Sequence, residues 1–224
     1  MGGYIKPNVS LSEDVEKVHY NYSPFNGHDY VDLGLPSGTL WATMNVGAYK
    51  PSEAGLYFQW GDTQGYTKDQ IGISEGKKAF NWDDYKFSID GSDSNFSKYT
   101  TKGATLELAD DAANANMGGS WHMPTPDQIK ELINETTNTW TTQDDVYGRL
   151  FKSKKDDSKS IFIPAVGYAS NGSLFDSGSV GYVWSSMLNT SYVGNGQYLN
   201  FDSSNVSLDG NYRYYGFSVR GVLG

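Results

Sequence analysis

Cysteine and long apolar runs are both missing from this chain of 224 residues. Without cysteine there are no disulfides, no thiolate metal ligands and no thiol nucleophiles. Because no window approaches the ~20 apolar residues of a membrane-spanning helix, we expect no direct membrane insertion. The 17 basic and 26 acidic residues give a formal net charge of −9. This acidic excess predicts no nucleic-acid partner, since phosphate backbones are bound by clustered cations.

The motifs of common enzymes are missing as well. The three histidines, His19, His28 and His122, are scattered, so each is interpreted as a surface or hydrogen-bonded structural residue. The sequence contains no Gly-x-Ser-x-Gly elbow, no phosphate-binding loop and no dinucleotide fingerprint. We therefore predict no catalytic residues, no cofactor and no tightly bound transition metal. Structural calcium stays open, because Asp and backbone oxygens in loops bind it without a sequence signature.

Adjacent carboxylates occur in four places, but their spacing does not predict catalysis. They are Asp83/Asp84, Asp110/Asp111, Asp144/Asp145 and Asp156/Asp157. A glycosidase needs two carboxyl groups separated across a cleft, which neighbours in sequence do not provide. Asp110 and Asp111 are expected in the first turn of a helix, where the helix dipole favours negative charge. The other pairs are interpreted as turn or solvated residues.

Tyrosine and glycine, in contrast, are abundant. The chain has 17 Tyr among its aromatic residues and 26 Gly, while charged residues make up only 19%. A composition rich in Tyr, Gly, Ser and Asn resembles that of binding surfaces, because tyrosine offers a large contact area at little cost in rotamer entropy.

The pattern of residues along the chain predicts an N-terminal polar arm and one α+β domain. The arm covers residues 1–27, with a short acidic helix over 11–18, and the domain covers 28–224. Residues 63–103 are interpreted as a long surface excursion pinned by aromatic side chains. Two principal helices are predicted near 109–116 and 126–134. The remainder is predicted to form short, mostly antiparallel strands with long loops.

The helix over 126–134 has the clearest start signal. Thr125 is the expected N-cap, because its hydroxyl can accept a backbone N–H of the first turn. Pro126 suits the first helical position, and Gln128 supplies the partner of a capping box.

Five segments occur in an order typical of one protein family. They are YVDLGLPSGTLWATMNVGA (residues 30–48), YFQWGDT (57–63), AANANMGGSWHMPT (112–125), VWSS (183–186) and GFSVR (216–220). This series resembles the family called the Fibrobacter succinogenes major paralogous domain, which is found widely in gut Bacteroidales. The resemblance covers about residues 28–222. The family continues with Pro-Val after the arginine, whereas Arg220 is followed here by Gly221 and Val222.

The resemblance implies a C-type-lectin-like fold of the formylglycine-generating-enzyme type in a secreted or surface-anchored protein. The formylglycine-generating oxidases depend on a cysteine pair and related iron-dependent members on clustered histidines, and this chain has neither. The first 18 residues lack a basic-then-apolar leader, so we expect no signal peptide in this sequence.

A second resemblance concerns the C-terminal third. Variable proteins of diversity-generating retroelements share this fold and a Trp-Ser-Ser … Gly-Phe-Ser-Val-Arg frame around a hypermutated segment. Their mutagenesis converts Asn codons into Tyr, Ser, Asp or Gly codons. Residues 182–215 contain six Tyr, six Ser, five Asn, two Asp and three Gly, which is the composition that such a history would leave. The resemblance implies a cell-surface, secreted or phage-particle location.

Alternation within the C-terminal third predicts which side chains face outward. Leu199 and Phe201 fall on one side of a strand and are expected in the core, together with Trp184, Phe217 and Val219. The polar and tyrosine positions are expected to form a mostly exposed, contiguous ligand-binding surface. Its predicted members are Tyr182, Asn189, Ser191, Tyr192, Asn195, Tyr198, Asn200, Asp202, Asn205, Ser207, Asp209, Asn211, Tyr212, Tyr214 and Tyr215.

These observations predict a non-enzymatic binding module, active in receptor binding or adhesion, whose partner is a protein or glycan ligand. A structural or fimbria-like surface subunit, assembled through the N-terminal arm, is the alternative. A formylglycine-generating-type enzyme ranks third. The ligand and the oligomeric state are not encoded in any motif of the sequence.

Overall fold

The structure is a computed structural model that describes residues 25–224 of the chain. Most of the predicted arm, including its helix over 11–18, therefore lies outside the described residues. The last three residues of the predicted arm, 25–27, are described and pack against the folded part. The backbone carbonyl of Phe25 accepts a hydrogen bond of 3.0 Å from the Trp121 indole, and the ring centroids of the two residues lie 6.3 Å apart.

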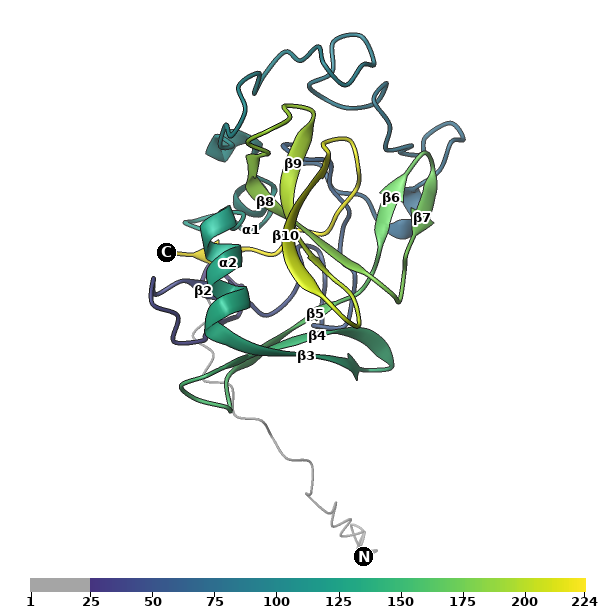
Figure 1. Cartoon of the computed structure of the whole chain (residues 1–224). Coiled ribbons are helices and arrows are strands. Elements are labelled where there is room, and N and C mark those ends of the chain that lie inside the picture. The colour runs from purple at the N-terminus through teal and green to yellow at the C-terminus, as the bar shows by residue number, and fades with distance from the viewer. Residues whose placement is uncertain (1–24) are drawn as a thin grey trace, which may run out of the picture.

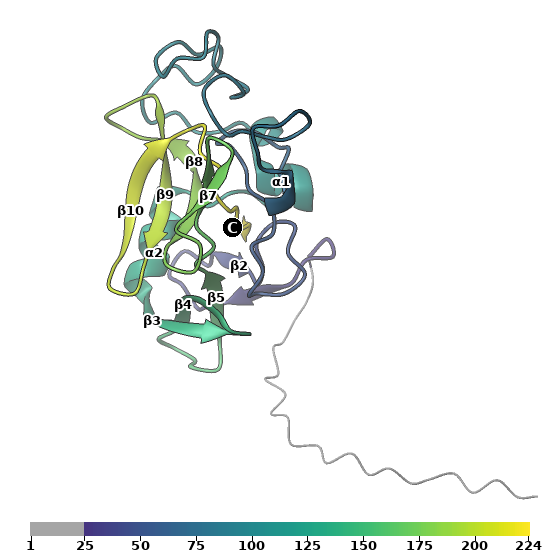
Figure 2. The same cartoon turned by 90° about the vertical axis from the view of Figure 1, so that its right-hand side faces the viewer.

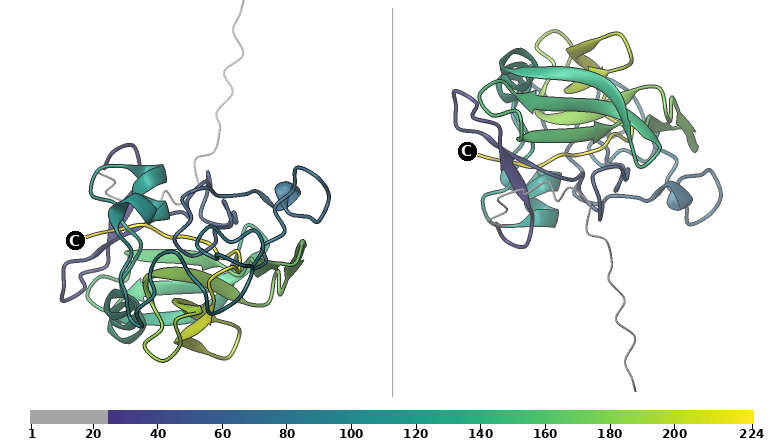
Figure 3. Two further views of the ribbon diagram at one scale, coloured as in Figure 1. Left: turned by 90° about the horizontal axis from the view of Figure 1, so that it is seen from above. Right: turned by 90° about the horizontal axis from the view of Figure 1, so that it is seen from below.

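The described residues form an α+β structure of small antiparallel sheets with two short α-helices (Figure 1). One sheet has the order β1-β2-β11, with bounds Tyr30–Asp32, Leu40–Ala42 and Val222–Leu223. A second has the order β3-β4-β5, with bounds Thr136–Gln143, Val146–Ser153 and Ser160–Pro164. Seen from below, the strands of this second sheet lie across the lower side of the molecule (Figure 3).

The third sheet and a separate hairpin come from the C-terminal third. The third sheet has the order β10-β9-β8, with bounds Val206–Tyr212, Asn195–Phe201 and Gly181–Leu188. The hairpin pairs β6 with β7, with bounds Tyr168–Ser170 and Ser173–Phe175. All pairings between these named strands are antiparallel, as the sequence predicts. Figures 1 and 2 show α2 on one side of the third sheet and the β6–β7 hairpin on the other.

Both predicted helices are present, with one corrected start. Helix α2 is Pro126–Glu135, and the predicted capping box forms between Thr125 and Gln128. Helix α1 is Ala112–Met117, so it begins three residues later than predicted. The reason is that Asp111 is the N-cap rather than a residue of the first turn, and its carboxylate accepts the backbone N–H of Asn114 at 2.9 Å. A 3₁₀ turn, η2, covers Leu108–Asp110. No helix among residues 25–224 is long and apolar enough to cross a membrane.

The predicted excursion of residues 63–103 crosses one end of the third sheet (Figure 1). Apart from the 3₁₀ turn η1, Lys68–Gln70, it contains no helix or named strand. Aromatic side chains hold it in place as predicted, since Phe80, Tyr85 and Phe87 are buried. Phe80 adopts a φ of +58°, a backbone conformation that a bulky residue rarely adopts. The excursion is therefore part of the folded structure rather than a linker.

Candidate functional site

The two faces of the third sheet have different partners. Register places Val183 opposite Leu199, and Leu199 opposite Leu208. These three residues and Phe201 belong to a hydrophobic cluster with Ile129 and Leu132 of α2. Because side chains alternate along a strand, Tyr182, Tyr198, Asn200, Ser207 and Asp209 point to the opposite face. The predicted core residues Trp184, Leu199, Phe201, Phe217 and Val219 are all buried.

The opposite face carries a continuous group of aromatic rings. Tyr168 of β6 lies 5.1 Å from Tyr182 of β8 and 4.9 Å from Tyr215, measured between ring centroids. Phe175 of β7 stacks on Tyr168 at 5.3 Å. Tyr212 has the parity of the inward Leu208, but it is the last residue of β10, and its ring lies 5.9 Å from Tyr215 on the far side of this group. These rings are all partly exposed, and they are called the tyrosine face below: Tyr168, Phe175, Tyr182, Tyr212 and Tyr215.

The excursion completes this arrangement at one end. The Trp82 ring lies 5.8 Å from Tyr212 and 4.8 Å from Tyr214. Tyr214 in turn contacts Tyr215 at 4.7 Å. Edge-to-face and offset pairs at these distances stabilise one another beyond the area that they bury. Rings from three separate segments of the chain therefore support one surface.

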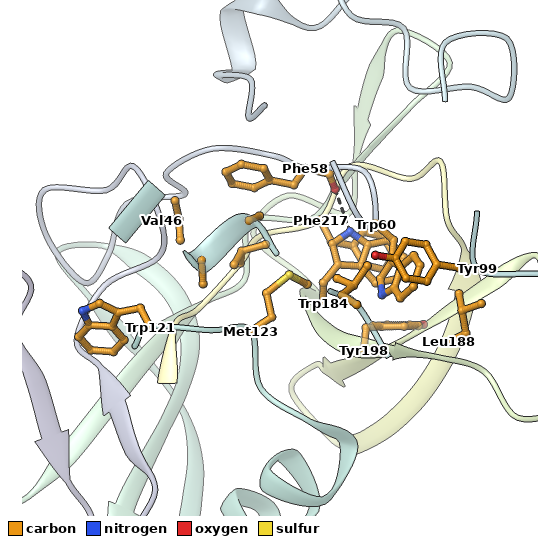
Figure 4. Close-up of a cluster of buried hydrophobic side chains, with 14 of the residues drawn as sticks. Val46, Phe58, Trp60, Tyr99, Trp121, Met123, Trp184, Leu188, Tyr198 and Phe217 are labelled. Carbon is orange, nitrogen blue, oxygen red and sulfur yellow. Dashed lines mark hydrogen bonds between the residues drawn. The ribbon is translucent and has the colours of Figure 1, made fainter. Parts of the chain in front are cut away.

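Two of the predicted surface residues are in fact buried. Tyr198 is 4% exposed and Tyr214 is 8% exposed, so the predicted exposure is wrong for both. Tyr198 is covered by Phe217, whose ring centroid lies 4.8 Å away, and it packs close to Trp184 (Figure 4). Tyr214 is covered by Trp82 of the excursion. Strand alternation cannot predict such burial, because the covering residues are distant in sequence.

The other predicted residues are at least partly exposed, and several of them lie outside the tyrosine face. Asp202 and Asn205 lie in the β9–β10 turn, where the Asp202 carboxylate accepts the N–H of Asn205 at 2.8 Å. Six residue steps along β10 separate this turn from Tyr212, a distance of roughly 20 Å. Asn189 holds a different turn, since its side-chain oxygen accepts the N–H of Ser191 at 2.8 Å. Five of the predicted residues therefore lie in turns between the strands rather than on them: Asn189, Ser191, Tyr192, Asp202 and Asn205.

Sequence reasoning missed Tyr168, Phe175 and Trp82 as members or supports of this surface. A usable signal exists for the first two residues. Asn171 and Gly172 form an Asn-Gly pair between β6 and β7, which is the strongest short-range indication of a hairpin. No comparable signal marks Trp82, whose position depends on the course of the excursion.

Asp176 supplies a negative charge at the edge of the tyrosine face. The Tyr182 hydroxyl donates a hydrogen bond of 2.8 Å to its carboxylate. Burial, followed by this bond and the Asp176 charge, raises the pKa of Tyr182 well above its ordinary value. Asp176 itself has a φ of +57°, and its carbonyl accepts the backbone N–H groups of Ser179 and Val180, each at 3.0 Å. The turn after β7 thus fixes this carboxylate beside the rings.

Arg213 lies in the chain between Tyr212 and Tyr214 but is completely buried beneath them. Its guanidinium carbon lies 3.6 Å from the Phe96 ring centroid, and one of its N–H groups donates to the Tyr99 carbonyl at 3.0 Å. Burial lowers the pKa of this arginine below its ordinary value. Arg213 therefore joins the C-terminal third to the excursion.

Features that would indicate other kinds of site lie elsewhere or are not found. His122 is hydrogen-bonded to the carbonyls of Met123 and Gly224, as expected for a structural histidine. A cavity of about 240 Å³ lies between the loop after β2 and α1, and none of the predicted ligand-binding residues lines it. Within residues 25–224 no group of three or more His, Asp or Glu side chains is placed to hold a metal ion.

Comparison of the chain with protein-family models, curated proteins and solved structures finds no match.

Proposed function

We propose that the protein is a non-enzymatic binding module and that the tyrosine face is its ligand-binding surface. The observation that carries this proposal is the cluster of accessible aromatic rings on the side of the third sheet away from α2. Phe175 is 43% exposed and Tyr212 is 36% exposed, so both offer apolar area to a partner. Contiguous exposed aromatic surface is costly in water unless a partner covers it. Tyrosine also combines a large contact area with few rotatable bonds.

The proposal includes the fold family and the origin of the surface. The motif series of residues 30–220 supports a C-type-lectin-like fold of the formylglycine-generating-enzyme type. The Tyr, Ser, Asn, Asp and Gly composition of residues 182–215 supports a segment diversified by a retroelement. Ser207, Asp209 and Asn211 on β10 are at least partly exposed, so they could vary with little effect on packing. A cell-surface, secreted or phage-particle location belongs to the same proposal.

The experiment is a binding screen with matched variants. The protein is screened against a glycan array and a peptide-display library. The test variant combines Tyr212→Ala with Tyr215→Ala. The control combines Tyr49→Ala with Tyr147→Ala, because these tyrosines are 92% and 51% exposed but lie outside the tyrosine face. Thermal unfolding of each variant shows whether it is folded.

We expect the wild type and the control to retain the same ligands, and we expect the test variant to bind them at least about tenfold more weakly. Equal binding by the test variant would contradict the proposal. A wild-type protein that retains no ligand from either collection would contradict it too.

A further inference from the structure

Within residues 160–224 the exposed charged side chains are all negative. Residues 160–224 contain three Asp and two Arg, and no Glu, Lys or His. Both arginines are completely buried, with 0% of their surface exposed. The three carboxylates, on Asp176, Asp202 and Asp209, are at least partly exposed. A ligand that contacts this part of the surface therefore meets aromatic rings and negative charge together.

Two of these carboxylates flank the tyrosine face. Asp176 accepts the Tyr182 hydroxyl at 2.8 Å, so its charge lies at the rim of the rings. Asp209 is exposed on β10, directly opposite Tyr198 in the register of the sheet. This register places the Asp209 carboxylate on the same face as the rings. Burial and then the Asp209 charge raise the pKa of Tyr198 to about 12.

The excursion adds further negative charge next to Trp82. Asp83 is exposed. The two excursion lysines nearest to Trp82 in sequence are paired with carboxylates. Lys78 lies 3.5 Å from Asp84, and Lys86 lies 2.7 Å from Asp110. Neither lysine therefore offsets the acidic rim.

The interior of the protein shows how its aromatic rings accommodate a cation. The guanidinium of Arg213 is surrounded by Phe96, Tyr85 and Trp60, at 3.6, 5.4 and 5.6 Å from their ring centroids. Its one hydrogen bond among the described residues goes to the neutral Tyr99 carbonyl. A guanidinium is attracted to ring faces at these distances, because the faces carry partial negative charge.

We infer that the tyrosine face binds cationic side chains, and that its partner is a protein segment rich in arginine or lysine. This inference rests on the proposed binding function and names the chemistry of its ligand. Guanidinium or ammonium groups would stack on Tyr168, Tyr212 and Tyr215 while Asp176 and Asp209 supply the opposite charge. The overall charge of −9 would also attract such a partner over long range.

Three probes separate this inference from its alternatives: octa-arginine, octa-glutamate and a neutral glucose hexasaccharide. The peptides are labelled and followed by fluorescence anisotropy, and the sugar is followed by calorimetry. The test variant combines Asp176→Asn with Asp209→Asn, which keeps the shape of both side chains. The control combines Asp127→Asn with Asp145→Asn, two exposed carboxylates of α2 and the β3–β4 turn that lie outside the face. Both variants change the net charge equally.

We expect octa-arginine to bind the wild type and the control with affinities within about twofold of each other. The Asp176/Asp209 variant and the Tyr212→Ala/Tyr215→Ala variant should each bind it at least about fivefold more weakly. Raising NaCl from about 50 mM to about 300 mM should weaken wild-type binding at least about threefold, because salt screens charge attraction.

Equal weakening in the test and control variants would mean that net charge alone attracts the peptide, and it would overturn the inference. Binding of the hexasaccharide or octa-glutamate that depends on Tyr212 and Tyr215, without binding of octa-arginine, would also overturn it. That second result would leave the binding function itself intact. The binding function fails separately, when the Tyr212/Tyr215 variant retains every ligand found in the screen.

Discussion

Asp110 shows how single residues fix the excursion to the rest of the protein. Its carboxylate accepts hydrogen bonds from Lys86 at 2.7 Å, from Lys98 at 2.5 Å and from the Tyr99 hydroxyl at 2.8 Å. Burial alone would raise the pKa of this carboxyl. The three donors outweigh burial and hold the pKa at about 2. One carboxylate thus joins the 3₁₀ turn before α1 to three residues of the excursion.

The low pKa of Asp110 predicts a stability contribution that depends on pH. The carboxyl has an ordinary value of 3.8 when unfolded and about 2 when folded, so the folded state holds the charged form more strongly. The contribution is present above about pH 4 and is lost as the pH falls towards 2. Asp110→Asn should cost about 2 kcal/mol at pH 7 and little near pH 2.

Urea unfolding of the wild type and Asp110→Asn across this pH range measures the effect. Asp127→Asn is the control, because Asp127 is exposed and its partner Lys130 lies 3.1 Å away on the same helix. A constant difference between wild type and Asp110→Asn from pH 7 to pH 2 would contradict the account.

At the scale of elements, helix caps and strand alternation can be predicted from the sequence. The burial of a side chain by residues distant in sequence cannot. The capping box at Thr125 depends only on residues three apart, and the alternation of Leu199 and Phe201 depends only on strand geometry. The burial of Tyr198 depends on Phe217, and that of Tyr214 depends on Trp82. Neither contact leaves a signal in the surrounding residues. The predicted start of α1 is three residues too early, because an aspartate such as Asp110 or Asp111 suits both the N-cap and the first turn of a helix.

The division between covered and exposed tyrosines predicts unequal mutational costs. Tyr198→Ala and Tyr214→Ala should each destabilise the protein by ~2–4 kcal/mol, because each removes a buried ring. Tyr212→Ala should cost within about 1 kcal/mol, since its ring is partly exposed. Phe201→Ala and Phe217→Ala, both of which truncate fully packed rings, should cost ~3–5 kcal/mol.

Denaturant unfolding of the five single variants gives these costs directly. We expect Tyr212→Ala to lower the free energy of unfolding clearly less than each of the other four variants does. Loss of as much stability in Tyr212→Ala as in Phe217→Ala would show that the Tyr212 ring belongs to the core.

At the scale of the whole molecule, both faces of the third sheet carry core side chains, and one of them also carries the tyrosine face. Its inner face packs on α2 and on Phe151 of β4. Its outer face buries Trp184 and Tyr198 against Phe217. The same face carries the exposed rings of the tyrosine face, to which the β6–β7 hairpin contributes and which the excursion supports at one end (Figures 1 and 2). This division accounts for an abundance of Tyr, Asn and Ser in strands that still hold a core.

The most direct measurement of this division compares two libraries of displayed variants. One library randomises four outward or strand-end positions of β10: Ser207, Asp209, Asn211 and Tyr212. The other randomises four inward positions of the same sheet: Val183, Leu199, Phe201 and Leu208. The fraction of folded members is read from display level and resistance to protease. The account predicts that most members of the first library fold and that few members of the second do. Equal loss of folded members in both libraries would contradict it.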